Sequence, residues 1–347
     1  MMKPERYLPA DIVCFGEVLM RLTAPLGSLL AEADTLGVRI GGAEANVAVA
    51  LAALEWRSAV ASVVPSGPLG RRARTFLRGA SVDTTRIAEA PGRLGLYFLT
   101  QGASLRASDV TYDRAGSAFA TIDWRAVDWD AMLDGARWLH VSGITPALGP
   151  EMADATMTAM RTARARGMRI SFDANYRARL WESWDSDPRA ILRELVAHAD
   201  LFFANHRDMA LLLDAPFSGD GPERRREAAE AAFAAFPNLR WIASTARVIA
   251  HVDCHRITAR LDTPSDSWQT REVEVAGIVD RIGAGDAFAA GVLHGLMGND
   301  DEDGREALAI QYGLALTCLK HSLAGDAALF DQHDIDRYLA GGLDVRR

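Results

Sequence analysis

The chain has 347 residues, with 38 lysines and arginines against 46 aspartates and glutamates, which gives a formal net charge of −8 at pH 7. That length is enough for one large α/β domain or for two ordinary ones. The acidic balance argues against a nucleic-acid coat or a polybasic membrane patch, because both need a local excess of positive charge. A small anionic ligand remains compatible with it, since a few well-placed arginines can dominate a cleft.

The N-terminal region and the cysteines indicate the compartment. Residues 47–54 form the longest apolar run of the N-terminal half, which is far too short to span a bilayer. Residues 1–10 contain no apolar stretch resembling a secretory signal. Cys14, Cys254 and Cys318 form no CxxC pair, so the sequence indicates neither a disulfide framework nor a zinc site. We therefore expect a cytoplasmic protein.

Apolar segments typical of β-strands alternate along the chain with alanine-rich segments of helical period. This order is typical of an α/β fold with a mainly parallel sheet covered on both faces, because parallel neighbours need long crossovers. We expect strands at 11–16, 58–63, 136–141, 168–172, 201–204 and 239–244. We expect helices at 45–54, 70–78, 151–166, 189–198, 223–236, about 284–297 and 305–321.

Two regions interrupt this alternation. Residues 19–40 are punctuated by glycine and proline, and residues 94–116 contain β-rich stretches with no helix between them, which suggests antiparallel strands. Both regions fit a small β appendage inserted into the α/β core, which could cover a cleft as lids do. An edge extension of the main sheet explains them equally well.

The sharpest motif is DRIGAGDAFAAG at residues 280–291. Gly283 and Gly285 precede a run of helix formers, so backbone N–H groups and the helix N-terminus can together form an anion cradle. Asp286 places a carboxylate where an anion is expected, although a plain helix cap is an alternative. A dinucleotide fingerprint does not fit, because Phe288 stands where its third glycine is needed, and no Walker A lysine follows.

Two motifs in this order resemble a known family. GAGDAFAAG at 283–291 resembles the C-terminal signature of the ribokinase-like (PfkB) sugar kinases, and GGAEANVA at 41–48 resembles their N-terminal glycine signature. The resemblance covers about residues 10–335. It implies a single ribokinase-like catalytic domain, a three-layer α/β/α sandwich with a mainly parallel central sheet and a small β lid formed by about 19–40 and 94–116.

Within that family the chain is most similar to 2-keto-3-deoxygluconate kinases. The further segments that carry this similarity are Gly16-Glu17, Tyr97, YDRAGS at 112–117, SGITP at 142–146, FDANYR at 172–177, Leu180-Trp181, KHS at 320–322 and Gly325-Asp326. The resemblance implies ATP-dependent phosphorylation of a hydroxyl of a keto-deoxy sugar acid, giving the 6-phosphate in the case of 2-keto-3-deoxygluconate.

The resemblance also implies roles for the glycine-rich motif. Asp286 would be the base that takes the proton from the sugar hydroxyl attacking the γ-phosphate of ATP. The amides of Gly283, Ala284, Gly285 and Asp286 would surround the migrating phosphoryl group with positive charge.

On the sugar side, Gly42 would let sugar hydroxyls approach the backbone. The amide of Asn46 would offer a donor and an acceptor, although Asn46 could be an ordinary polar residue at a helix start.

Arg114 and Arg177 are the candidates that would set the substrate class. A sugar acid has a carboxylate that a neutral hexose lacks, and a planar guanidinium can match it with two hydrogen bonds. Each arginine could instead be a surface salt-bridge partner. Tyr97 and Tyr112 would add a hydroxyl and an aromatic wall, although aromatic residues in strands are more often part of a core.

The nucleotide side follows the family pattern less closely. Asn205 begins NHRD, where relatives usually show Asn-x-x-Glu near magnesium, so Asp208 would reach Mg²⁺ through a water; the alternative is a helix-capping asparagine. No residue is predicted as a direct metal ligand. Residues 244–251 lack the glycines with which relatives contact phosphates, so Thr245 or Arg247 would take over that contact.

A monovalent cation site and the assembly state are left open by the sequence. Asp280 survives in a loop whose carbonyls bind such a cation in relatives, but Arg281 and Ile282 replace the common Thr-Thr, so activation by K⁺ is an open question. Relatives associate through the lid, and we expect a homodimer or a higher homo-oligomer, with no nucleic-acid or membrane partner.

Two other functions remain compatible with the sequence. One is a sugar-acid-binding protein with little kinase activity, which the retention of Asp286 and its flanking glycines disfavours. The other is a kinase for a neutral ketose or a nucleoside, which the pair Arg114 and Arg177 disfavours.

Overall fold

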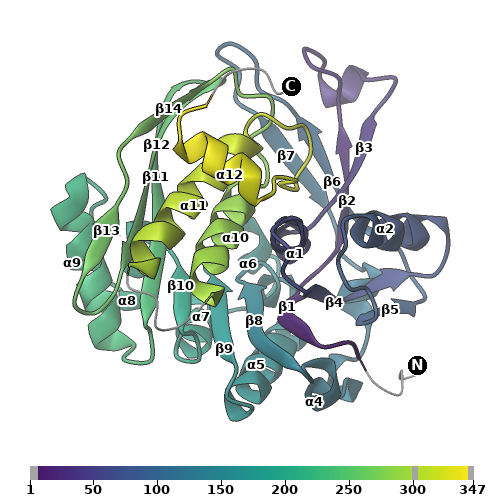
Figure 1. Cartoon of the computed structure of the whole chain (residues 1–347). Helices are drawn as coiled ribbons and strands as arrows, with labels where there is room; N and C mark the ends of the chain where they lie inside the picture. Colours follow the sequence, from purple (N-terminus) through teal and green to yellow (C-terminus); the bar gives the residue numbers. More distant parts are fainter. Residues whose placement is uncertain (1–6, 299–303, 343–347) are drawn as a thin grey trace.

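The computed structural model describes residues 7–298 and 304–342. Within those residues the centre of the molecule is a 10-stranded sheet with helices on both faces (Figure 1). Its strands are β1 (Ala10–Phe15), β4 (Ser58–Pro65), β5 (Ile87–Ala90), β8 (Ala136–Ser142), β9 (Arg169–Asp173), β10 (Leu201–Phe203), β11 (Trp241–His251), β12 (Cys254–Asp262), β13 (Ser267–Gln269) and β14 (Val273–Ala276).

The strand order confirms the predicted fold class. Neighbours follow the order β13-β12-β11-β10-β9-β8-β1-β4-β5, and β14 pairs with β12. Every neighbouring pair from β5 to β11 is parallel, whereas β12 pairs antiparallel with β11, β13 and β14. The sheet is therefore mainly parallel, with an antiparallel edge.

Alternate side chains of β1 explain why helices cover both faces. Ile12 and Cys14 pack in one apolar cluster and Val13 and Phe15 in another, because successive side chains of a strand point to opposite faces. The first cluster contains side chains of α1 (Ala43–Ala53), α2 (Pro68–Gly79), α10 (Ala284–Met297), α11 (Arg305–Lys320) and α12 (Gln332–Leu339). The second contains side chains of α3 (Ala118–Thr121), α4 (Trp129–Met132), α5 (Pro150–Ala165), α6 (Ala178–Trp181), α7 (Pro188–Val196), α8 (His206–Leu213) and α9 (Gly221–Ala235).

A second sheet has four strands in the order β3-β2-β6-β7 within the described residues. They are β2 (Leu19–Thr23), β3 (Gly37–Gly41), β6 (Gly95–Thr100) and β7 (Asp109–Asp113). They come from the two regions that interrupt the strand–helix alternation. Figure 1 shows this second sheet beside α1 and separate from the central sheet. That this second sheet closes over a cleft as a lid stays a prediction.

Strand β11 is longer than the sequence predicts. The expected strand ends at Ser244, but β11 continues to His251 and pairs antiparallel with β12 along almost its whole length. Its last residues are largely exposed and include Arg247, so they show no apolar alternation from which a strand could be predicted. Thr245 and Arg247 therefore lie on an extended strand, not in a loop after one.

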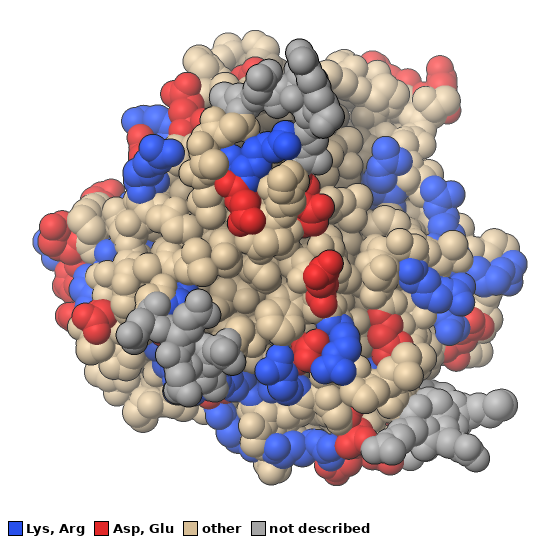
Figure 2. All heavy atoms as spheres, viewed as in Figure 1, with Lys and Arg blue, Asp and Glu red and all other residues tan. Residues whose placement is uncertain are grey.

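The surface in Figure 2 shows Lys and Arg side chains interspersed with Asp and Glu. Across the described part of the chain, the helices are too short or too polar to cross a membrane.

Candidate active site

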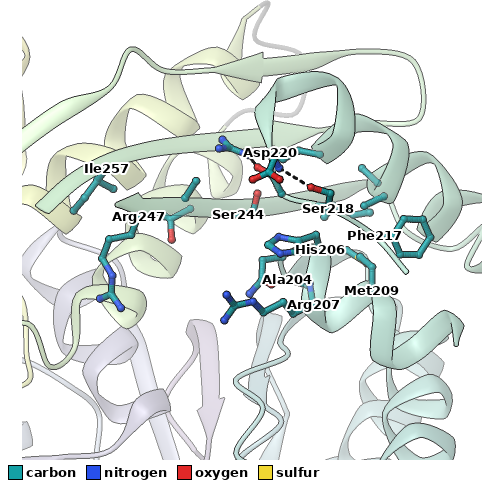
Figure 3. A pocket seen from close by; sticks show the side chains of 18 of the residues that line it. Ala204, His206, Arg207, Met209, Phe217, Ser218, Asp220, Ser244, Arg247 and Ile257 are labelled. Atoms are coloured by element: carbon teal, nitrogen blue, oxygen red, sulfur yellow. Dashed lines mark hydrogen bonds between the residues drawn. The ribbon is translucent and has the colours of Figure 1, made fainter. Parts of the chain in front are cut away.

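Two cavities adjoin each other in the molecule. The small cavity, about 280 Å³, is lined by residues of both sheets, of α1 and of the loop before α10. The large cavity, about 840 Å³, is lined by the β10–α8 connection, β11 and the start of α10 (Figure 3). Arg247 and Gly285 line both cavities, so the two spaces meet at these residues. Figure 3 shows Arg247 extending from β11 at one end of the large cavity and Phe217 at the other.

The structure brings the predicted site residues to these two cavities, with two exceptions. The small cavity is lined by Gly42, Asn46, Tyr97, Tyr112, Arg114, Arg177, Gly283 and Asp286. The large cavity is lined by Asn205, Thr245, Arg247, Ala284 and Gly285. The exceptions, Asp208 and Asp280, are not among the lining residues of either.

Asn205 and Asp208 form a capping box at the start of α8. The backbone N–H of Asn205 donates to the Asp208 carboxylate at 2.8 Å, and the Asn205 side chain accepts from the N–H of Arg207 at 2.8 Å. These contacts satisfy N–H groups that a helix start leaves unpaired. They correspond to the helix-capping alternative, and a water-mediated contact from Asp208 to Mg²⁺ stays a prediction.

The loop before α10 is shaped by two glycines. Gly283 has a φ of +81°, and a Cβ there would overlap the carbonyl oxygen of Asp326. A Cβ at Gly285 would meet open space, so the backbone at Gly285 faces the cavities without obstruction. The N–H of Ala284 donates to the carbonyl of Arg281 at 3.3 Å. The backbone N–H of Ala284 is therefore less available to bind an anion than the sequence predicts. The N–H groups of Gly285 and Asp286 are better candidates for that contact.

Asp286 and Asn46 meet across the cavity although they lie far apart in the chain. Nδ2 of Asn46 donates to Oδ2 of Asp286 at 2.6 Å. Burial raises the pKa of Asp286 to about 8, the hydrogen bond from Asn46 opposes the shift, and the negative charge of Asp173 adds to it. A carboxyl group with a pKa near neutrality is suited to accept a proton from an alcohol.

The turn into α1 also requires a glycine. Gly42 has a φ of +134°, and a Cβ there would overlap the carbonyl oxygen of Glu17. Two residues later, the buried carboxylate of Glu44 accepts from Ser142 Oγ at 2.6 Å and from Thr145 Oγ1 at 3.1 Å. Glu44 thus ties the start of α1 to the end of β8. Its place inside the GGAEAN motif is the signal that could have singled it out.

The two candidate arginines have different environments. Arg114 is buried and pairs with buried Glu17, with Nε and Nη2 at 2.8 and 2.6 Å from the same carboxylate oxygen. Arg177 is exposed at the cavity, and its Nη1 donates a hydrogen bond to the carbonyl of Tyr176 at 3.0 Å. Arg177 is therefore the guanidinium available to a ligand carboxylate, whereas the charge of Arg114 is largely balanced by Glu17.

A buried network joins the second sheet to the loop before α10. Arg21 of β2 contacts Asp280 at 2.6 Å and Asp326 at 2.8 Å, and all three side chains are nearly inaccessible to solvent. The hydroxyl of Tyr97 donates to the other Asp326 oxygen. Asp280 accepts from the N–H of Ile282 at 3.0 Å. The hydroxyl of Tyr97 therefore bonds a protein carboxylate and is not free to bind a ligand. The sequence analysis assigned no role to Arg21 or Asp326.

Asp173 is a further residue of the site that sequence reasoning passed over. It lies at the end of β9, lines the small cavity, and accepts from the N–H of Asn175 at 3.1 Å. Burial raises the pKa of Asp173 to about 7, and the nearby charge of Asp208 adds to the shift. The FDANYR segment at 172–177 contains both Asp173 and Asn175, so the signal was present in the sequence.

The model of the family described as "pfkB family carbohydrate kinase" matches residues 9–327. The chain belongs to this family. The predicted family and the predicted enzyme class, a carbohydrate kinase, are thereby confirmed. A 2-dehydro-3-deoxygalactonokinase of Haloferax volcanii is 33% identical over 96% of this chain and 98% of its own length.

Solved structures of other kinases agree with the fold. The 2-dehydro-3-deoxygluconokinase of Thermotoga maritima superimposes with a TM-score of 0.88 at 35% identity, covering 95% of this chain and 99% of its own. A fructokinase of Xylella fastidiosa with bound ATP has a TM-score of 0.77 at 21% identity, covering 95% and 98% of the two chains. The second likeness concerns the fold alone.

Proposed function

We propose that this pfkB-family kinase transfers the γ-phosphoryl group of Mg²⁺-ATP to a hydroxyl of a 2-keto-3-deoxy sugar acid, with 2-keto-3-deoxygluconate giving the 6-phosphate. The observation that carries the proposal is the contact between Asn46 and Asp286 beside the junction of two cavities. The relatives named for 2-dehydro-3-deoxy sugar acids support the substrate class.

In this mechanism the small cavity holds the sugar acid. Arg177 would bind its carboxylate in a bidentate manner, and Tyr112 would form an aromatic wall. Asn46 would orient the reacting hydroxyl and, at the same time, hold the carboxylate of Asp286. Asp286 would then take the hydroxyl proton as the oxygen attacks phosphorus.

The large cavity would hold the nucleotide. Its polar lining at the junction, Arg247 with the amides of Gly285 and Asp286, fits the phosphate groups, because first-turn N–H groups and guanidinium are both anion donors. Asn205 and Thr245 line the same space. Bound Mg²⁺-ATP supplies the phosphoryl group and a metal charge that offsets phosphate repulsion. The amides stabilise the charge that develops on the transferring group.

The second sheet would act as a lid, and two copies of the chain would associate through it. Leu26, Leu29 and Leu105, in the connections between its strands, are all exposed apolar side chains, which supports an association surface. A molar mass equal to one chain at micromolar concentration, measured by size-exclusion chromatography with light scattering, would contradict the association.

The proposal is tested by measuring ADP release with a panel of acceptors. The panel contains 2-keto-3-deoxygluconate, its galactonate epimer, gluconate, fructose, ribose and adenosine. We expect the highest kcat/KM for one of the two keto-deoxy acids, and the preferred epimer identifies the substrate. A higher value for fructose, ribose or adenosine would establish the neutral-acceptor alternative. Binding of a sugar acid by calorimetry without ADP release would establish a binding protein instead.

A further inference from the structure

Lys320, the last residue of α11, has a buried charge that the proposed chemistry does not use directly. The residue is 0% exposed. Its Nζ donates to the main-chain carbonyl of Leu323 at 3.0 Å and lies 3.4 Å from the carbonyl of Asp280. Within the described residues these are its hydrogen-bond partners, and no carboxylate lies within ion-pair distance. A buried ammonium held by neutral carbonyls is costly, so its retention calls for a function.

The two carbonyls belong to segments that bracket the reaction site. Asp280 begins the loop that leads to Asp286, and Leu323 lies in the turn after α11. The same two segments are joined a second time, because the N–H of Gly325 donates to the Asp280 carboxylate at 2.9 Å. Lys320 therefore sits behind the phosphate-facing loop and connects it to the C-terminal helices.

The charges around Lys320 favour a cation at this point. Burial lowers the pKa of Lys320, while the negative charges of Asp280 and Asp326 act in the opposite direction; Arg21 also lowers it, and Asp286 raises it. Converging main-chain carbonyls next to carboxylates are also the ligands that bind K⁺ or Na⁺ in proteins. The ammonium group of Lys320 therefore lies where a monovalent cation could otherwise bind.

We propose that the Lys320 ammonium is a built-in monovalent cation that positions the 280–286 loop, so that phosphoryl transfer by this chain needs no K⁺. A K⁺ site that uses the carbonyl of Asp280, which the sequence left open, does not fit here, because Lys320 already contacts that carbonyl. Lys320 is a positioning residue, since it acts through the loop and touches no reacting atom. The effect on turnover rests on the proposed kinase function, whereas the occupancy of the cation position does not.

The first experiment varies the cation and leaves the protein unchanged. Wild-type turnover is measured in choline, Na⁺ and K⁺ buffers, with ADP quantified directly by chromatography because coupling enzymes can themselves require K⁺. We expect rates that agree within about twofold. A rate at least about tenfold higher in K⁺ would overturn the proposal.

The second experiment removes the ammonium in two ways. Lys320→Met keeps the length and loses the charge, and we expect kcat to fall about 10²-fold in every buffer, as for a misplaced catalytic loop. Lys320→Ala leaves room for an ion, so K⁺ should raise kcat of this variant at least about tenfold. K⁺ should also raise the Tm of Lys320→Ala, whereas the Tm of the wild type and of Lys320→Met should not change with K⁺. An undiminished kcat in Lys320→Met would overturn the proposal.

The thermal readout separates this inference from the function on which it rests. If wild type releases no ADP with any acceptor in any buffer, the kinase proposal fails, and Tm of Lys320→Ala still reports on the site. A rise of that Tm specific to K⁺ supports the built-in cation, and the absence of any rise overturns it. If Lys320→Met does not fold, the proposal is tested by the wild-type turnover in the three buffers and by the thermal melts of Lys320→Ala.

Discussion

In the small cavity, the contacts that hold Arg114 and Asn46 join residues distant in the sequence, whereas Asn205 and Ser218 of the large cavity bond near neighbours. Arg114 and Glu17 are 97 residues apart, and Asn46 and Asp286 are 240 apart. In the large cavity, Asn205 bonds a residue three positions away and Ser218 bonds one two positions away. The small cavity therefore requires both sheets and α10 to be assembled, whereas the strand–helix connection that lines the large cavity is shaped largely by local contacts.

This difference explains where the family pattern is kept and where it has changed. A site held by long-range pairs loses several contacts when one residue changes, so its residue types are tightly constrained. A phosphate site built mainly from backbone amides and one guanidinium can exchange its donors. If Thr245 or Arg247 contacts phosphate as we propose, the glycine-free segment 244–251, which continues as strand β11, is such an exchange.

The largest effect is expected at the contact that closes the small cavity. Asp286→Asn should lower kcat by about 10²–10⁴-fold, because the general base is lost while the shape is kept. Steady-state kinetics measures the loss, and calorimetry with Mg²⁺-ATP should give an unchanged affinity. Near-normal turnover would remove Asp286 from the role of base.

The same variant has a second signature in stability. The pKa of folded Asp286, about 8, lies above its ordinary value of 3.8, so the folded protein binds more protons than the unfolded chain between those pH values. Wild type therefore loses stability as pH rises from about 4 to about 8. Asn removes this loss, and the Tm advantage of Asp286→Asn should grow through that window in thermal melts without ligand.

The next largest effect concerns the network between the second sheet and the loop. Arg21→Met leaves Asp280 and Asp326 without their buried partner, which should cost about 3–5 kcal/mol in the free energy of unfolding. Chemical denaturation measures it. The matched control is Arg39→Met on neighbouring β3, where the exposed guanidinium contacts a backbone carbonyl, and a change within about 0.5 kcal/mol is expected. Equal losses in both variants would contradict the network.

A smaller effect separates the two arginines of the small cavity. Arg177→Ala should raise KM for the sugar acid by about 10–100-fold, the loss of a charge-assisted bidentate contact, and change KM for a neutral analogue much less. Arg179→Ala, an exposed arginine two residues further on, is the matched control with no expected change. If KM rises equally for both acceptors, Arg177 does not bind the carboxylate.

The smallest expected effect is a shift of the pH profile of kcat/KM, in opposite directions for two variants. In wild type, kcat/KM should rise with pH up to about 8, as the carboxyl group of Asp286 loses its proton. Asn46→Ala removes a hydrogen bond that lowers the pKa of Asp286, so the rising limb should move to higher pH. Asp173→Asn removes a charge that raises this pKa, so the limb should move to lower pH. Profiles that shift the same way in both variants would assign the limb to another group.

Much of the fold and the residue types of the site were predictable from local signals. Helix α10 lies at Ala284–Met297 as its alanine-rich period predicts, and the parallel strands β1, β4, β8, β9 and β10 fall within three residues of the expected bounds. Gly42, Asn46, Gly283 and Asp286 of the two glycine motifs line the small cavity. The exposed arm of β11 was not predicted, because its polar side chains carry no periodic signal.

The sequence by itself determined the alternation of strands and helices, the glycine turns at Gly42 and Gly283, and the choice of Arg114, Arg177 and Asp286 as candidate site residues. Only the tertiary structure decided that Glu17 balances Arg114, that Arg177 stays available, and that the ammonium of Lys320 holds the carbonyl of Asp280. The reason is physical: backbone propensity and periodicity act over a few neighbouring residues, whereas the partner of a buried charge is chosen by packing between distant segments.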